Sequence, residues 1–177
     1  MKVKLLKLVD PFYQIFTKKL FIDVCQHGWK LNPSNCRCYK YVTTPTTWTE
    51  ANRICQRIAP TNSFPNPPIT RRHLAAIANS QENNFVANLA GGNTAWIGGI
   101  RMPDGTFSWT DGQRWEGGYK NWRAGQPDNG NGVETSIEIN YNYEGFGRGF
   151  GLWNDKAYVC QYLDLTKLDL CSVCGSS

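Results

Sequence analysis

The chain has 177 residues, of which 41% are hydrophobic and 13% aromatic. These values fit one globular domain with a sizeable core and exclude a disordered chain. The formal net charge is +5, but residues 1–20, with five lysines against one aspartate, carry +4 of it and leave +1 for the rest. A remainder so close to neutral offers no basic stripe to a phosphate backbone, so a nucleic-acid partner is not expected. No apolar run reaches the roughly 18 residues of a membrane span.

The first predicted element is a helix over Trp48–Ile58. Thr47 and Glu50 have the spacing of a capping box, and apolar side chains recur at helical intervals along the segment. Four prolines follow in residues 60–68 without any periodicity. The stretch Pro60–Thr70 is therefore predicted to be a surface loop.

A second helix is predicted over Gln81–Ala90, with Ser80 as its cap. Phe85, Val86 and Leu89 share one face of this helix. The pair Gly91-Gly92 is typical of a helix end, because glycine adopts the left-handed conformation that closes a helix.

Strands are predicted after this second helix. Trp96–Ile100 is a short apolar strand, and a turn at Pro103-Asp104-Gly105 leads into a second strand over Thr106–Trp109. Residues Asp111–Gly151 are rich in Gly, Asn, Tyr and Trp without a period, which indicates a long working loop. The run Lys156–Leu163 is again strand-like.

The seven cysteines gather toward the two ends of the chain, at Cys25, Cys36, Cys38, Cys55, Cys160, Cys171 and Cys174. In an oxidising compartment this distribution indicates disulfides that join the termini. A four-cysteine zinc site from Cys36, Cys38, Cys171 and Cys174 is the alternative, and extra disulfides are the simpler interpretation. The odd count leaves one thiol free or paired with a second copy, which is a route to a disulfide-linked homo-oligomer.

A series of short motifs then follows one order along the chain: His73–Ile77, Glu82–Val86, Trp96-Ile97-Gly98-Gly99, Phe107–Gly112, Asn121-Trp122, Gly125–Asn129 and Trp153-Asn154-Asp155. From Cys25 to Tyr162 the sequence resembles the C-type lectin-like family. The resemblance implies an α+β double-loop fold with two helices, small antiparallel sheets and a long calcium-binding loop. It also implies three segments: a leader or tail (1–24), the lectin-like domain (25–163) and a Cys-containing tail (164–177). The lysines, Asp10 and Pro11 make residues 1–24 a poor secretory signal, so an extracellular location is expected from the cysteines and the family alone.

The family resemblance also implies cysteine pairs. Cys55 and Cys160 match the long-range bridge, and Cys25 with Cys38, or alternatively with Cys36, matches an amino-terminal hairpin bridge. A further inner bridge of the family is expected to be absent, because Ser136 stands in the place of one partner.

The resemblance implies one calcium ion held by five oxygen ligands: Gln126, Asp128, Glu134, Asn154 and Asp155. In the family the peptide bond before the proline of the first motif, here Gln126-Pro127, is cis and turns both flanking side chains to one side. Three carboxylates and two amides without Cys or His suit calcium better than zinc. Asn129 and Thr135 stand where acidic ligands of a second ion are expected, so one ion is predicted.

In sugar-binding relatives the same ligands also bind two hydroxyls of the sugar, so glycans or glycoproteins are the expected partners. The Gln-Pro-Asp order favours galactose or N-acetylgalactosamine. Galactose binders usually place an aromatic residue just after this motif, whereas this chain has Gly130. Trp122, Tyr141 and Phe146 are the candidates to replace it.

The alternative function is a calcium-independent, protein-binding domain that uses Pro60–Thr70 or Tyr141–Phe150. No Ser-His-Asp arrangement, phosphate-binding glycine loop or HExxH motif occurs. Asp128 and Glu134 could form a glycosidase pair, but carboxylates committed to a metal are poor general acids. No catalytic residue is predicted, and the protein is expected not to be an enzyme.

Overall fold

The computed structural model describes residues 25, 27–58, 72–143, 147–157 and 171–176. The first helix, α2, covers Trp48–Arg57, in agreement with the prediction. Its cap is Thr47, whose hydroxyl accepts a hydrogen bond from the backbone N–H of Glu50 at 3.3 Å. Trp48, Ala51 and Cys55 form the buried face of the helix. Capping and amphipathic spacing therefore place this helix as the sequence indicated.

The second helix, α3, covers Ser80–Leu89. Its cap is Asn79 rather than Ser80, because Asn79 has an extended backbone and its side-chain oxygen accepts the N–H of Glu82 at 2.9 Å. Ser80 is already the first helical residue. Gly91 and Gly92 have φ values of +63° and +76° and end the helix as predicted.

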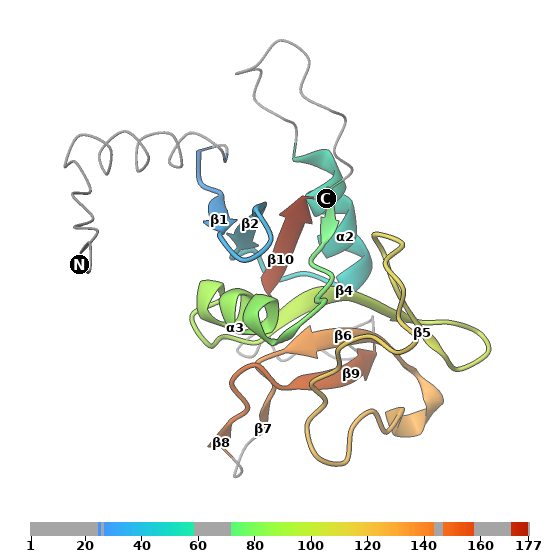
Figure 1. Ribbon diagram of the computed structural model, residues 1–177. Coiled ribbons are helices and arrows are strands. Elements are labelled where there is room, and N and C mark those ends of the chain that lie inside the picture. The colour runs from blue at the N-terminus through green and yellow to red at the C-terminus, as the bar shows by residue number, and fades with distance from the viewer. Residues whose placement is uncertain (1–24, 26, 59–71, 144–146, 158–170, 177) are drawn as a thin grey trace, which may run out of the picture.

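Most strands join one sheet, in the order β1 (Lys30–Asn32), β2 (Arg37–Val42), β10 (Cys171–Ser176), β4 (Ala95–Arg101), β6 (Glu134–Ile139) and β9 (Trp153–Ala157). On its flanks, β3 (Arg72–Leu74) pairs with β10, and β5 (Phe107–Trp109) pairs with β4. The pairings are antiparallel except for β10 with β4. The short strands β7 (Asn142–Tyr143) and β8 (Gly147–Arg148) form a separate ribbon at the end of the domain away from α2 (Figure 1).

Several strands lie where the sequence did not indicate them, and two of these, β10 and β6, lie in the middle of the sheet. The segment 164–177 was expected to be a tail, yet β10 lies between β2 and β4, beside α2 (Figure 1). The stretch Asp111–Gly151 was expected to be irregular, yet it contains β6. In β6, Ile137 and Ile139 alternate with Ser136 and Glu138, but all four are buried. This short alternation does not stand out in a stretch otherwise rich in Gly, Asn and Tyr.

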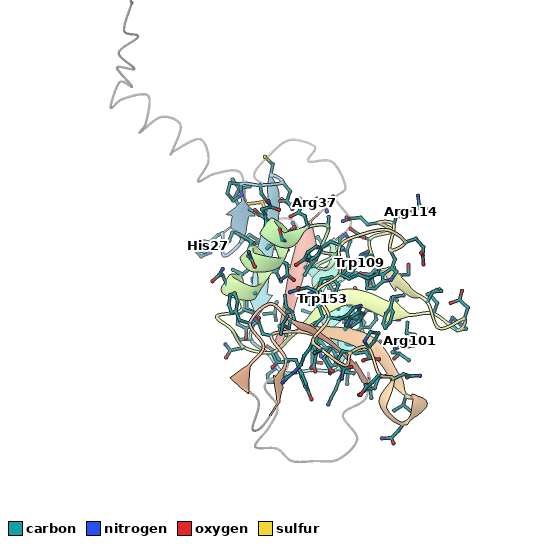
Figure 2. The ribbon with its side chains drawn as sticks, turned by 60° about the horizontal axis from the view of Figure 1, so that its bottom comes forward. His27, Arg37, Arg101, Trp109, Arg114 and Trp153 are labelled. Atoms are coloured by element: carbon teal, nitrogen blue, oxygen red, sulfur yellow. A yellow bond between two sulfur atoms is a disulfide. The ribbon has the colours of Figure 1, made fainter. Side chains whose placement is uncertain are left out.

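The larger hydrophobic cluster packs α3 against the central strands and is dominated by tryptophan rings. Trp109 and Trp153 meet edge to face with ring centroids 5.6 Å apart, in the interior of the domain (Figure 2). β4 lies close to its neighbours because it contains glycines. A Cβ atom on Gly98 would lie 2.5 Å from the carbonyl oxygen of Leu74, and one on Gly99 would overlap the side chain of Ile137.

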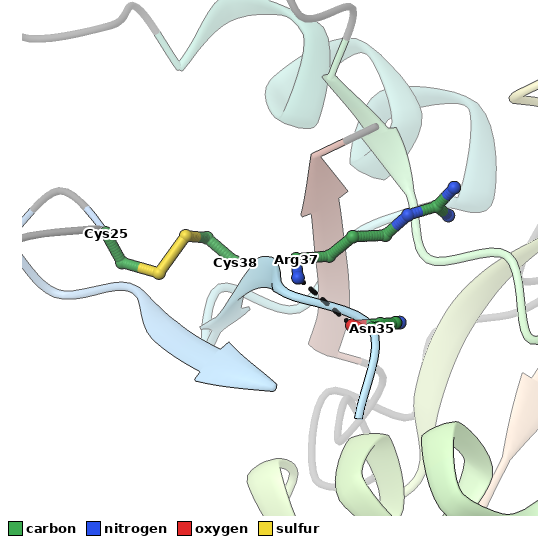
Figure 3. Close-up of a disulfide and its surroundings, with 4 residues drawn as sticks. All are labelled: Cys25, Asn35, Arg37 and Cys38. Carbon is green, nitrogen blue, oxygen red and sulfur yellow. Dashed lines mark hydrogen bonds between the residues drawn. A yellow bond between two sulfur atoms is a disulfide. The ribbon is translucent and has the colours of Figure 1, made fainter. Parts of the chain in front are cut away.

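Cys25 and Cys38 form a disulfide at the amino-terminal hairpin (Figure 3). This confirms Cys38, and not the alternative Cys36, as the partner of Cys25. Cys38 is therefore not available to a zinc site, and Cys36 is exposed and free. Cys55 is also disulfide-bonded, but its predicted partner Cys160 lies outside the described residues.

The residues 1–24 and the loop Pro60–Thr70 also lie outside the part of the chain that the structure describes. Within that part, none of the helices has the length and apolar character needed to cross a membrane.

Candidate metal centre

Three structural segments supply the predicted ligands. The loop before β6 carries Gln126 and Asp128 on either side of Pro127, and the Gln126-Pro127 bond is cis. Glu134 is the first residue of β6. Asn154 and Asp155 lie on β9, where Asp155 pairs with Ile137 of β6. The pairing of β6 with β9 thus brings Glu134 and the loop before it next to Asn154 and Asp155.

The three acidic side chains converge. One oxygen each of Asp128, Glu134 and Asp155 lies within 4.8 Å of the others. Burial increases across the cluster, because Asp128 is exposed, Glu134 is half-buried and Asp155 is fully buried. The cluster is therefore anchored in the domain on one side and open to solvent on the other.

Asp155 fixes the backbone of the ligand loop. Its Oδ1 accepts the N–H of Asp128 at 3.1 Å, and its Oδ2 accepts the N–H of Asn129 at 2.9 Å. Glu134 closes the turn, since its Oε2 accepts the N–H of Gly130 at 2.9 Å and its own N–H donates to the side chain of Asn129 at 3.1 Å. These bonds hold the carboxylates in a defined arrangement.

The two amide side chains are oriented by hydrogen bonds of their own. The Oε1 of Gln126 accepts the N–H of Asp128 at 3.1 Å. The amide nitrogen of Asn154 donates to Oε1 of the buried Glu138 at 2.8 Å. This bond uses the nitrogen of Asn154 and leaves the amide oxygen as its potential metal ligand.

Arg101, at the end of β4, is a site residue that the sequence did not indicate. Its Nη2 lies 2.6 Å from Oδ2 of Asp155 and forms an ion pair with it. Its Nε donates to the carbonyl oxygen of Glu134 at 3.0 Å. Figure 2 shows Arg101 beside β6. Nothing in the sequence around Arg101 indicates that its partner is Asp155, so local sequence patterns could not have predicted this ion pair.

Two glutamates at the site, Glu134 and Glu138, have raised pKa values, and burial is the main cause for both. Burial raises the pKa of Glu134 above its usual value, the hydrogen bond from Gly130 lowers it, and the charges of Asp155 and Asp128 raise it further. Burial raises the pKa of Glu138 to about 7, against the lowering effects of Lys156 and Asn154. Several carboxylates are thus held close together at a cost in electrostatic free energy, and a cation bound between them would lower that cost.

The donor set fits a hard cation. Carboxylate and amide oxygens are the ligands that Ca²⁺ prefers, and neither Cys nor His belongs to the cluster. The convergence of three carboxylates and the solvent-open side of the cluster leave room for a bound cation. Asn129 uses its amide oxygen inside the loop, where it accepts the N–H of Glu134.

A model of the family described as the lectin C-type domain matches residues 44–166, which is more than half of the chain. The chain belongs to the C-type lectin domain family. This lectin domain is 31% identical to a protein named lectin from Pleurodeles waltl over 150 residues, covering 78% of this chain and 76% of that protein.

Solved structures show the same fold as this C-type lectin domain. The C-type lectin CEL-I from Cucumaria echinata superposes with a TM-score of 0.66 at 25% identity, covering 86% of this chain and 97% of that one. A calcium-independent type II antifreeze protein superposes with a TM-score of 0.61 at 22% identity, covering 86% and 95%. The second likeness concerns the fold alone.

Two of the three aromatic residues that were candidates for contact with a sugar, Trp122 and Tyr141, are half-buried. Trp122 packs on the core, with its ring centroid 5.2 Å from that of Phe107 and 5.8 Å from that of Trp153. Tyr141 lies under the guanidinium of Arg123 at 5.5 Å. Phe146 lies outside the described residues.

Proposed function

We propose that this domain binds carbohydrate in a calcium-dependent manner and has no catalytic activity. One Ca²⁺ would be held by Gln126, Asp128, Glu134, Asn154 and Asp155. The observation that carries this proposal is the convergence of Asp128, Glu134 and Asp155 within 4.8 Å, from three segments and with one open side.

The bound ion would supply free coordination positions for two neighbouring hydroxyls of a sugar. Residues of the loop would bind the same hydroxyls by hydrogen bonds. Asp128 is exposed and Gln126 half-exposed, so both present oxygens at the rim of the loop where a ligand has access. The Gln-Pro-Asp order favours galactose or N-acetylgalactosamine, carried on glycans or glycoproteins.

The test is calorimetric titration of calcium into the oxidised domain, followed by galactose and mannose with and without chelator. We expect one bound ion, a heat of galactose binding only in its presence, and a smaller or absent heat for mannose. Ion binding without heat from either sugar would remove the carbohydrate part of the proposal. No ion binding would remove both parts.

The second candidate is calcium-independent binding of another protein, and one observation favours the calcium-independent part of it. Arg101 already pairs with the buried Asp155, so the site has one positive charge of its own. A fold neighbour is named as a calcium-independent antifreeze protein, so the fold itself does not require calcium. Ligand capture that survives chelator and D128N would favour this candidate.

A single sugar bound through one ion and a few hydrogen bonds typically has millimolar affinity, roughly −4 kcal/mol. Clustering of several domains raises the effective affinity.

The free, exposed Cys36 is a candidate for a disulfide between two copies. A dimer band on a non-reducing gel that disappears with reductant and in C36S is the expected result. The disulfides favour an extracellular, oxidising location.

A further inference from the structure

Arg101 is built into the domain by contacts with three different segments. Its side chain bonds Asp155 on β9 at 2.6 Å, the carbonyl oxygen of Glu134 at the start of β6 at 3.0 Å, and the carbonyl oxygen of Gly105 in the β4–β5 turn at 3.2 Å. The guanidinium also lies over the ring of Phe107, 4.4 Å from its centroid. The side chain of Arg101 is only 16% exposed and that of Asp155 is not exposed. Such a fork of directed bonds differs from a solvated surface ion pair.

Asp155 connects this arginine to the ligand loop. The carboxylate of Asp155 accepts the N–H groups of Asp128 and Asn129 as well as the guanidinium. Without a neighbouring cation, the buried carboxylate of Asp155 would cost free energy. If this carboxylate moved, the N–H groups of Asp128 and Asn129 would lose their hydrogen-bond acceptor. Arg101 therefore stabilises the loop through Asp155.

We propose that Arg101 is a resident cation of the site, which keeps the ligand loop ordered without a metal ion and lowers the affinity of the site for calcium. The second half of this statement rests on the proposed calcium site, and the first half does not. Any ion that Asp155 binds would share this carboxylate with a guanidinium of the same sign. Repulsion between neighbouring charges in a partly buried site is much stronger than in bulk water.

The two halves predict opposite effects of one substitution. R101M removes the charge and keeps an unbranched apolar side chain that can pack on Phe107. We expect calcium affinity to rise about tenfold or more by calorimetry, because the repulsion is gone. We also expect amide hydrogen exchange of the peptide containing Asp128 and Asn129 to become about tenfold faster in chelator, because Asp155 is no longer held.

The matched control is R53M, which removes the same charge from an exposed arginine of α2. R53M is expected to leave calcium affinity and loop exchange within about threefold of the wild type, because exposed charges are screened by solvent and salt. R101K keeps the charge but loses the guanidinium fork. It is expected to keep calcium affinity near the wild-type value while loop exchange accelerates, and it serves as the test if R101M does not fold.

Each outcome decides one half. Unchanged or weaker calcium binding by R101M would refute the effect on affinity, and unchanged exchange in chelator would refute the role in loop order. If neither the wild type nor the variants bind calcium, the proposed function fails together with the effect on affinity. Faster exchange in R101M would then still support Arg101 as the resident cation, so the two failures are distinguishable.

Discussion

Asn154 and Glu138 face each other across β9 and β6, and the amide of Asn154 donates a 2.8 Å hydrogen bond to the Glu138 carboxylate. Both side chains are almost completely buried, with exposures of 3% and 2%. The carboxylate of Glu138 on β6 thus orients Asn154, a potential metal ligand on β9. Such outer partners usually matter for metal affinity as well as for stability.

The burial of Glu138 predicts a pH dependence of stability in chelator. The folded-state pKa of about 7 lies above the unfolded value near 4.5. The folded state therefore binds more protons between these values, and stability falls as pH rises from about 4.5 to 7. E138Q keeps an acceptor for Asn154 and removes the charge. We expect its advantage over the wild type to grow by about 2–3 kcal/mol from pH 4.5 to pH 8.

Denaturant unfolding of both proteins in chelator measures this difference. E116Q, at an exposed glutamate, is the control and is expected to follow the wild-type profile. An E138Q variant with the same pH profile as the wild type would show that the Glu138 carboxyl does not titrate in this range.

D128N tests the ligand role of the most exposed carboxylate. The substitution preserves shape and removes one of three converging charges, so we expect calcium affinity to fall about tenfold or more. Stability in chelator is expected to stay the same or to rise, because repulsion within the cluster is relieved. Calorimetry and thermal unfolding give the two readouts, and E116Q again is the charge-matched control. A D128N variant with wild-type affinity would exclude Asp128 from the ion's ligands.

Y39F tests a buried hydrogen bond at the amino-terminal end of α3. The hydroxyl of Tyr39 donates to Oε1 of Glu82, and both residues are 1% exposed. Burial and the neighbouring carboxylate raise the pKa of Tyr39, so the hydroxyl remains a donor throughout the neutral range. Its loss leaves a buried carboxylate short of one donor and is expected to cost about 2 kcal/mol of stability.

Chemical denaturation measures the cost. Y119F removes the hydroxyl of a partly exposed tyrosine and is expected to change stability by less than about 0.5 kcal/mol. Equal effects of the two substitutions would argue against a special contribution of the Tyr39–Glu82 bond.

Ser136 offers a stabilising substitution. It is fully buried in β6, and its hydroxyl has no hydrogen-bond partner among the described residues. S136A removes this unpaired group and is expected to raise stability by about 1 kcal/mol, seen as a higher thermal midpoint. S108A, at a half-exposed position of β5, should have little effect. A loss of stability in S136A would reveal a partner for the Ser136 hydroxyl.

Helices were predictable from the sequence because their signals are local. Thr47 lies three residues from the N–H that it caps, and Asn79 stands in the same relation to Glu82. The neighbouring Ser80 has the same capping chemistry as Asn79, so the sequence placed the cap one residue late. β10 and β6 could not be recognised in this way, because both are short and their stability comes from pairing with strands that are distant in the sequence.

The sequence by itself determined the family and both helices, and it predicted the three acidic residues that converge at the candidate site. It left open whether Cys36 or Cys38 pairs with Cys25, since both are within reach along the chain. Tertiary structure decided that choice and also brought Arg101 to Asp155, which lies 54 residues further along the chain. A contact at such a separation depends on the register of β4, β6 and β9 together, and that register is fixed only when the whole sheet packs.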